Sequence, residues 1–359
     1  MAAAGAMARI RGPGGLLASA GMSLVAMVVD PLTGPAPEGW DEFVSDQRLL
    51  PVWSSRLLRA ADWCAQTASS MVLVRESGGG PPVAAFHTRH LGLGHPGRFV
   101  QPGRIPVASL TECRTAPATT EAGLAFARAT GERDRAEAVR VFERAIRARA
   151  GPGGRAIAYR NLLDRHLPVV PAAGRVKLRV TPRMVLTNQW PDLAGYLASL
   201  PGKWRSQLRK IRDTVRTDPS LRFAVAGTID PAEAGWLAEV VRNRYASRAV
   251  PRPPLPAGYF AELGRLPGSR FLTYRDGRGR LVGYSALYDD GQELRLICWG
   301  SRGETDGRRG NLYFDQYLRL VELMVGTGRR RLILGPGMQR IKARYGARPE
   351  PRWALVGLR

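Results

Sequence analysis

The sequence is poor in cysteine, lysine and long apolar runs, and each shortage excludes a class of protein. Its three cysteines, Cys64, Cys113 and Cys298, are odd in number and far apart, so they indicate free thiols in a reducing compartment rather than a disulfide framework. The absence of a Cys-x-x-Cys pair excludes the common structural zinc sites. No run reaches the roughly 20 strongly apolar residues of a membrane span. We therefore expect a cytoplasmic protein with no integral membrane association and no metal site.

Histidine is equally scarce, with four in the chain and none after His166. The second half therefore lacks the side chain that most often serves as a general base, and Cys298 lacks the basic partner that a nucleophilic thiol needs. The histidines His87, His90 and His95 lie close together in the sequence. No carboxylate or thiolate lies beside them in the sequence to complete a metal site.

The sequence has an excess of positive charge, since 54 basic against 30 acidic residues give a formal net charge of +24. Lysine occupies only positions 177, 203, 210 and 342, and such a preference for arginine is typical of a GC-rich genome. Codon bias does not explain why bases outnumber acids. Residues 1–174 carry a net charge of +6 and residues 175–359 carry +18. We therefore expect the second half to meet a polyanion, such as nucleic acid, a phosphorylated co-substrate or an anionic surface.

The order of elements in the second half indicates a mixed sheet. A short helix over 192–200 is broken by Pro201-Gly202. Three strands joined by tight turns come before a glycine-rich loop, a helix and a further strand, so the last strand is reached by a crossover connection. These elements are expected over 270–274, 281–288 and 293–299 for the strands, 312–325 for the helix and 331–334 for the last strand.

The first half also mixes helices and strands. We expect strands over 23–29, 71–75, 82–88 and 156–160, and helices over 41–46, 53–64 and 134–149, with a Gly- and Pro-rich loop over 92–117. A length of 359 residues suits two domains. Together these elements predict an α+β fold in which each domain has a mixed, mostly antiparallel sheet flanked by helices.

The helix expected over 203–216 carries an unusual charge pattern. Its apolar residues are spaced four, three and four apart, which gives a clean stripe. On the opposite face no acid occurs until Asp213, so the neighbouring charges repel by a few tenths of a kcal/mol per pair. A solvated surface face remains one interpretation, and contact with a polyanion is the other. The basic residues are Lys203, Arg205, Arg209, Lys210, Arg212 and Arg216.

Several segments of the second half together resemble the GNAT acyltransferase superfamily, and more narrowly its FemAB/FemX-like, peptidoglycan-biosynthesis branch, in which two GNAT-like domains are fused. The resemblance rests on Tyr196–Leu200 followed by Trp204–Ile211, on Gly283-Tyr-Ser-Ala286, on Asn311-Leu-Tyr-Phe-Asp315, and on Gly335-Pro-Gly337 followed by Ile341–Ala347. It implies an N-terminal GNAT-like domain over 22–180 and a C-terminal GNAT domain with the active site over 181–359. Residues 1–21 are expected to form a disordered extension.

The resemblance implies direct acyl transfer from a thioester or ester to an amine, with no covalent enzyme intermediate. The donor would insert where the strands 293–299 and 331–334 separate, and backbone groups of the first strand would hold its carbonyl. The superfamily's acyl-CoA pyrophosphate loop reads R/Q-x-x-G-x-G/A, but the loop Ser301–Asn311 does not have this spacing. The expected donor-binding residues are Trp299, Gly303, Gly307, Arg308, Arg309, Gly310 and Asn311.

Three residues are the candidates for catalysis, and two of them have a structural alternative. Asp315 would be a base or an anchor for the amine, or else it complements the helix dipole. Tyr313 would donate a proton, or else it packs in the core. Lys342 is a lysine in a chain that prefers arginine, so its position favours a compact point charge. Asn311 is in addition a natural helix cap.

Three functions remain open. The first is an N-acyltransferase that moves an acyl group from an acyl-CoA type donor to an amine of a small molecule or peptide. The second is a FemX-like transferase that uses aminoacyl-tRNA and forms an amide or peptide bond. The third is a non-catalytic polyanion-binding protein on a GNAT scaffold. No cofactor is expected to be bound permanently, and acyl-CoA or aminoacyl-tRNA would be a co-substrate in the two enzymatic functions.

Overall fold

The structure is a computed structural model that describes residues 23–65, 68–92, 108–116, 119–244, 254–303, 307 and 309–358. The extension expected over 1–21 lies outside the described residues, as do His95 and Arg308. In the first half the elements are β1 (Leu24–Val29), α1 (Trp40–Asp46), α2 (Ser55–Ala65), β2 (Ala68–Glu76), β3 (Pro82–Gly92), β4 (Ser109–Cys113), β5 (Leu124–Phe126), α3 (Glu132–Ala150) and β6 (Gly154–Leu162).

The second half follows the expected order of elements closely. The strand β7 (Arg175–Thr187) ends the first half, and the elements of the second half are α4 (Leu193–Ser199), α5 (Gly202–Arg216), β8 (Leu221–Ala226), α6 (Pro231–Arg244), α7 (Ala257–Gly264), β9 (Ser269–Asp276), β10 (Leu281–Asp289), β11 (Glu293–Ser301), α8 (Leu312–Gly326), β12 (Arg331–Gly335), α9 (Gln339–Arg344) and β13 (Arg348–Leu358).

All strands join one continuous sheet in the order β1-β2-β3-β4-β6-β13-β7-β12-β11-β10-β9-β8, with β5 beside β3. Among the described strands only two neighbouring pairs are parallel, namely β4 with β6 and β11 with β12. Each parallel pair is joined by a helix, α3 in the first half and α8 in the second. The predicted mixed, mostly antiparallel α+β architecture with two similar halves is thus confirmed.

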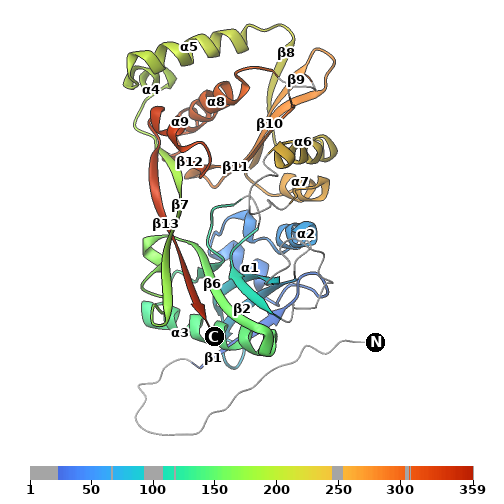
Figure 1. Ribbon diagram of the computed structural model, residues 1–359, viewed down its shortest axis with the longest axis vertical. Helices are drawn as coiled ribbons and strands as arrows, with labels where there is room; N and C mark the ends of the chain where they lie inside the picture. Colours follow the sequence, from blue (N-terminus) through green and yellow to red (C-terminus); the bar gives the residue numbers. More distant parts are fainter. Residues whose placement is uncertain are drawn as a thin grey trace.

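The two halves exchange a strand. The strand β7 follows β6 in the chain but pairs with β12 of the second half, while β13 follows β12 but pairs with β6 of the first half. The two exchanged strands also pair with each other, from Arg175 opposite Gly357 to Val185 opposite Arg348. In Figure 1 they form the long ribbon that connects the lower and upper parts of the molecule. The strand β7 runs through residue 180, where the sequence suggested a domain boundary.

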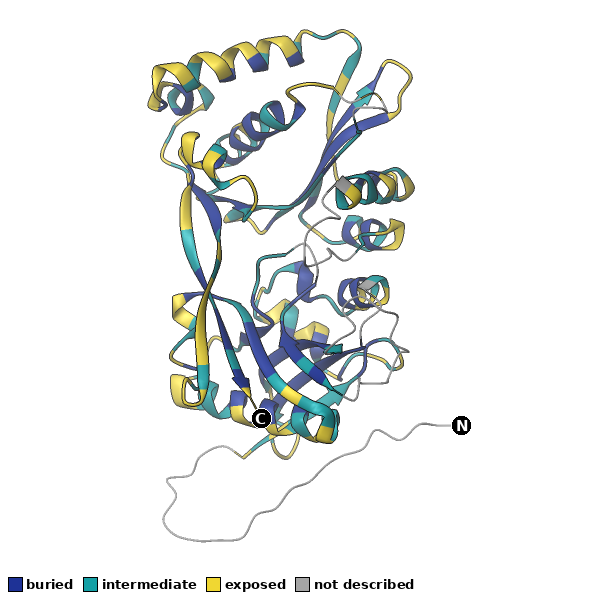
Figure 2. Ribbon diagram, viewed as in Figure 1, coloured by how far each residue is buried: buried dark blue, intermediate teal, exposed yellow. Residues whose placement is uncertain are grey.

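Helices cover both faces of the second half. The helices α6 and α7 lie on one side of the sheet, while α8 lies on the other and is itself covered by α4 and α5 at the top of the molecule (Figure 1). Apolar residues of α4 and α5 pack with residues of α8, including Leu197, Leu208 and Val321. The outer face of α5 is left exposed (Figure 2).

The first half departs from expectation in its middle section. The segment interpreted as a Gly- and Pro-rich loop over 92–117 contains β4, whose residues are mostly buried between β3 and β6. The strands β5 and β7 were not predicted either. Only three residues make up β5, and β7 has exposed residues along its first half and a proline at position 182, so neither shows the pattern of a buried strand.

None of the helices in the described part of the chain combines the length and apolar character that a membrane crossing requires.

Candidate functional site

The two strands of the second parallel pair separate soon after they begin. The register pairs Glu293 with Arg331 and Arg295 with Ile333, and β11 then continues to Ser301 without β12 beside it. In the first half, by contrast, β4 pairs with β6 along its whole length, from Ser109 to Cys113. Along the later part of β11, no described strand therefore occupies the side that faces β12, so backbone groups there are available to an inserted acyl arm.

A bulge lies at this separation. The partners on β10 shift between Ala286, which faces Cys298, and Leu287, which faces Leu296, so Ile297 is an extra residue in β11. A bulged residue is left out of the ladder and re-aims the local backbone. The arrangement supports the expectation that backbone groups of β11 hold the carbonyl of an acyl donor.

Aromatic side chains form a chain of ring contacts beside the separated strands. Trp299 on β11 contacts Tyr313 in the first turn of α8, with ring centroids 6.2 Å apart. The chain continues through Phe314 to Tyr345 at the end of α9 and from there to Trp204 on α5. Trp299 and Tyr313 are half-buried rather than in the core. Two of the sequence-predicted residues are thus brought together.

Lys342 lies at the carboxyl end of β12, and its side chain is buried with 4% exposed surface. Its Nζ donates to the carbonyl oxygen of Leu334 at 2.5 Å and to that of Gly335 at 3.3 Å. No acidic side chain in the described part of the chain forms an ion pair with it. Burial lowers the pKa of Lys342 from 10.5 to about 8.

The helix α9 that carries Lys342 is fixed from its far end. The hydroxyls of Tyr196 on α4 and Tyr317 on α8 both donate to the carbonyl oxygen of Tyr345, at 2.9 and 3.0 Å. The backbone N–H of Ala347 donates to the carbonyl of Lys342. These contacts hold a six-residue helix in one place, and with it the lysine.

Asp315 is fully buried and its carboxylate is engaged on both oxygens. The Tyr274 hydroxyl donates to Oδ2 at 2.8 Å, and Arg319 donates to the same oxygen at 2.6 Å. Arg216 of α5 reaches Oδ1 at 3.4 Å. Asp315 therefore holds α8 to β9 and to α5, and in this arrangement it has no exposed surface for a substrate amine. A catalytic role for Asp315 stays a prediction.

The expected donor loop is described only in part. Gly307, Arg309 and Gly310 are exposed, and Gly303 is half-buried. Asn311 occupies the cap position of α8 in the left-handed conformation, with φ 63°, but its side chain makes no capping hydrogen bond. The prediction that Asn311 lies at the helix cap is therefore confirmed, although its side chain does not cap the helix, and the binding roles of the loop residues stay predictions.

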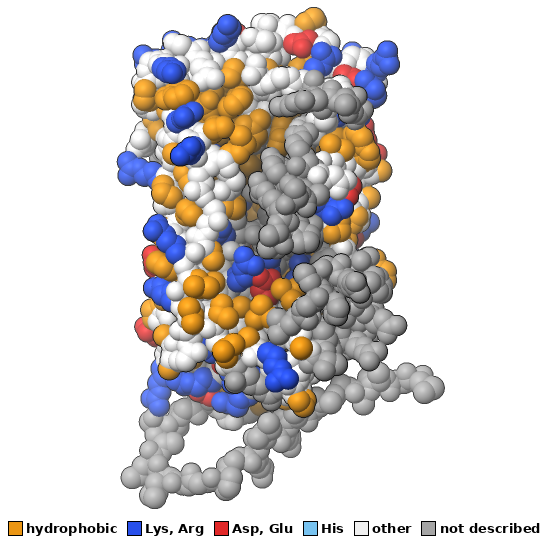
Figure 3. Space-filling view, viewed as in Figure 1, with side chains coloured by type: hydrophobic (Ala, Val, Ile, Leu, Met, Phe, Trp, Pro, Cys, Tyr) orange, Lys and Arg blue, Asp and Glu red, His pale blue; other side chains and the backbone are white. Residues whose placement is uncertain are grey.

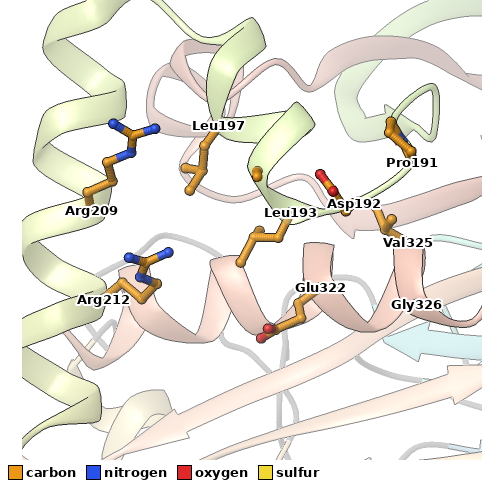
Figure 4. Close-up of a pocket in the computed structure, with 10 residues that line it drawn as sticks. Pro191, Asp192, Leu193, Leu197, Arg209, Arg212, Glu322, Val325 and Gly326 are labelled. Atoms are coloured by element: carbon orange, nitrogen blue, oxygen red, sulfur yellow. The ribbon is translucent and has the colours of Figure 1, made fainter.

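The residues of the basic helix divide into two groups. Arg216 pairs with Glu322 as well as with Asp315, and Arg212 pairs with Asp213. The other four basic residues form no ion pair with any acid in the described part of the chain, and they are Lys203, Arg205, Arg209 and Lys210. Between α5, α4 and the end of α8 lies a groove of about 750 Å³, lined in part by Arg209 and Arg212 (Figure 4).

Two buried polar side chains near the separated strands were missed in the sequence. Ser285 on β10 lies opposite Trp299, and Gln316 follows Asp315 on α8. The Oγ of Ser285 and the Nε2 of Gln316 have no hydrogen-bond partner among the described residues, although both residues are buried. In the sequence, Ser285 could have been identified as the polar residue inside the otherwise mostly apolar segment Leu281–Leu287.

The first half has a buried charge cluster that the sequence also concealed. His87 was expected to lack a carboxylate partner, but Asp62 of α2 lies 2.7 Å from its Nε2. Arg89 donates to the other oxygen of Asp62 at 3.2 Å. Although burial raises the pKa of Asp62, His87 and Arg89 lower it below its usual value. The described residues contain no group of three metal-ligating side chains.

Comparisons with known proteins agree with this geometry. Residues 202–343 match the family model of the acetyltransferase (GNAT) domain. No curated protein sequence matches the chain.

Among solved structures, the fold is similar to L-PGS from Bacillus licheniformis, with 11% identity, a TM-score of 0.56, and coverage of 90% of this chain and 92% of that one. It is also similar to the C-terminal domain of a protein assigned as lysylphosphatidylglycerol synthetase from Agrobacterium fabrum, with 14% identity, a TM-score of 0.54, and coverage of 89% of this chain and 90% of that one. A third similar structure is FemX, with 9% identity, a TM-score of 0.53, and coverage of 83% of this chain and 91% of that one. At these identities the likeness is one of fold. The GNAT match covers the separated strands and Lys342, and most of the chain shares the fold of FemX.

Proposed function

We propose that the chain is an aminoacyl-tRNA-dependent transferase that forms an amide bond on an amine of a small molecule or peptide. The observation that carries the proposal is Lys342, a buried ammonium group at the end of β12 with a pKa of about 8. Support comes from the net charge of +18 on residues 175–359, from the loop Ser301–Asn311 without the acyl-CoA spacing, and from the fold shared with a protein assigned as lysylphosphatidylglycerol synthetase.

Transfer from an aminoacyl ester requires a general acid that protonates the leaving ribose oxygen. The acceptor amine attacks the ester carbonyl, a C–N bond forms, and the C–O bond to the ribose oxygen breaks. A ribose alkoxide is strongly basic and needs a proton as it leaves, whereas a thiolate, with a thiol pKa near ~8.5, leaves without one. An ammonium group with a pKa of about 8 gives up its proton more readily than an ordinary lysine. The attacking amine loses one proton to solvent as the C–N bond forms, and Lys342 regains its proton from solvent, so the proton count balances.

The other groups at the site have supporting roles in this proposal. Backbone N–H groups of β11 near the bulge at Ile297 would stabilise the oxyanion of the tetrahedral intermediate. The half-buried rings of Trp299 and Tyr313 would pack against the terminal ribose and base, because nucleobases stack on aromatic side chains.

The test compares donors. The purified full chain is incubated with charged bulk tRNA or with labelled acetyl-CoA, with and without RNase, and label transferred to an amine pool is measured. We expect transfer from charged tRNA that RNase abolishes. Transfer from acetyl-CoA that is insensitive to RNase would replace the proposal with the acyl-CoA function.

The role of Lys342 is tested in the same assay. Lys342→Met should lower kcat by roughly 10²- to 10⁴-fold, which is the usual contribution of general acid–base catalysis. Lys177→Met is the matched control, because Lys177 is an exposed lysine on β7. If Lys342 is the acid, the rate of transfer should fall as the pH rises through about 8. A rate that rises through this range would assign it the role of a base instead.

A further inference from the structure

We infer that the outer face of α5, together with the groove beside it, is the surface that binds the RNA backbone of the donor. The inference rests on the proposed function for the identity of the RNA, but its evidence is the charge, exposure and placement of α5. The surface comprises four side chains on the helix, Lys203, Arg205, Arg209 and Lys210, and Arg212 at the groove.

The charge of the four helix residues Lys203, Arg205, Arg209 and Lys210 is not neutralised within the described part of the protein, while Arg212 is paired with Asp213. The four residues form no ion pair there, whereas the next two arginines of the same helix are paired with acids. At a rise of 1.5 Å per residue, the four charges are spread along about 10 Å of helix. Duplex nucleic acid carries one negative charge per ~1.7 Å of its axis, so a cationic helix of this density is complementary to it.

The groove adds two directed guanidinium groups. Figure 4 shows Arg209 and Arg212 extending from α5 toward the space between α4 and α8. The two acids that line the same groove are already engaged, since Asp192 caps α4 through the N–H of Gly195 and Glu322 pairs with Arg216. The floor is apolar, formed by residues such as Leu193 and Val325. A phosphate group in this groove would lie beside two guanidinium groups, each of which can donate two parallel hydrogen bonds to phosphate oxygens.

The position of α5 relative to the proposed site supports an RNA donor. At its amino end, Trp204 contacts the ring of Tyr345, and the guanidinium of Arg344 lies 4.7 Å from the Trp204 ring, so α5 adjoins the helix of Lys342. At its carboxyl end, Arg216 reaches Asp315 in the first turn of α8, next to the donor loop. A duplex bound along α5 would therefore place its single-stranded end near the separated strands.

An anionic membrane fits this surface less well than RNA. Helices that bind membranes insert large apolar side chains at the interface. The apolar stripe of α5, which includes Leu208, Ile211 and Val215, is instead buried against the layer below. The large exposed apolar residues of the described chain lie elsewhere, on elements such as β7 and α6, and none is on α4, α5 or α8. Lys and Arg side chains are visible along the upper part of the molecule in Figure 3.

The experiment measures binding of uncharged bulk tRNA by fluorescence anisotropy between 50 and 200 mM salt. One variant replaces Lys203, Arg205, Arg209 and Lys210 with Gln. The matched control replaces four exposed basic residues outside this surface, Arg133, Arg155, Lys177 and Arg179, with Gln, and therefore has the same net charge.

If each of the four residues neutralises one phosphate, the slope of log K against log salt should become shallower by about 3.6 in the first variant. The ratio of wild-type to variant affinity should then fall roughly 150-fold between the two salt concentrations. The control should keep nearly the wild-type slope. Equal losses in both variants, or no tRNA binding by the wild type at 50 mM salt, would overturn the inference.

Two further measurements separate this surface from the chemistry. With charged tRNA, the α5 variant should raise KM and leave kcat unchanged, because the surface does not touch the reacting atoms. If no transfer occurs but the loss of tRNA binding is confined to the α5 variant, the proposed function fails and the surface stands. The second measurement is binding to vesicles rich in phosphatidylglycerol. If the α5 variant loses binding to these vesicles but binds tRNA as well as the wild type does, the inference is overturned.

Discussion

The buried lysine makes an unusual prediction, namely that removing it alters stability in a pH-dependent way. The pKa of Lys342 is about 8 in the folded chain against 10.5 for the free side chain, and the cause is burial. A difference of one in pKa corresponds to ~1.4 kcal/mol, so the charged lysine costs the fold about 3 kcal/mol at neutral pH. Between pH 8 and 10.5 the unfolded chain binds more protons than the folded one, so stability rises with pH across that window.

Lys342→Met removes the titrating group while retaining a long flexible side chain. The difference in free energy of unfolding, wild type minus variant, should therefore increase by about 2 to 3 kcal/mol between pH 7 and pH 10. Urea denaturation followed by fluorescence at the two pH values measures it. Lys177→Met loses only the contact of an exposed ammonium group with the Trp353 ring, so it should change stability by no more than about 1 kcal/mol, and by nearly the same amount at both pH values.

A constant difference between wild type and Lys342→Met at the two pH values would refute this reasoning. It would mean that the contacts of Nζ with the carbonyl oxygens of Leu334 and Gly335 offset the burial of its charge. If the difference instead increases with pH as expected, then Lys342 lowers stability at neutral pH while lying beside the separated strands. Such a cost is typical of functional sites.

Three further changes test the structure around the site. Asp315→Ala leaves two arginines and the Tyr274 hydroxyl without their shared partner, so it should lower the free energy of unfolding by about 3 kcal/mol in urea denaturation, with Asp315→Asn losing less. Gly300→Ala would place a Cβ in steric overlap with the Tyr284 ring, so a loss of about 1 to 3 kcal/mol is expected, and an unchanged midpoint would contradict it. Burial opposes the ionisation of Glu121, but Arg295 and Arg183 lower its pKa. The charged Glu121 therefore contributes to stability above about pH 4.5, and this contribution should be lost as the pH falls through the pKa of Glu121 in the folded chain. In acid denaturation, the difference in free energy of unfolding between wild type and Glu121→Gln should then become smaller.

Much of the second half could be predicted because its local signals agree with one another. Asp192 caps α4 through the N–H of Gly195, and Asp230 caps α6 through that of Glu233, and each is a short polar residue directly before a helix. The apolar stripe predicted α5, and the turns between β9, β10 and β11 predicted these three strands. Each of these signals depends on residues a few positions apart, which is what a sequence records directly.

The first half and the fine structure of the site depend on distant partners. The strand β7 is held by β13, and Val176 and Leu178 on it are exposed, so only its later part, from Arg183 to Leu186, is buried. The environment of Asp315 was equally hidden, since two of its partners, Tyr274 and Arg216, lie some 41 and 99 positions away in the sequence. The sequence could identify Lys342 as unusual, but not that it lacks an acidic partner among the described residues.

The exchange of strands between the halves has a consequence for how the chain is synthesised. The strand β6 gains its partner β13 only when residues such as Leu358, opposite Ala156, have left the ribosome. Until then the edge of β6 is open, and open edges are sites of wrong pairing and aggregation. Pairing across some 200 residues is also slow to form. We therefore expect the first half to remain incomplete during translation, and neither half to fold stably when expressed alone.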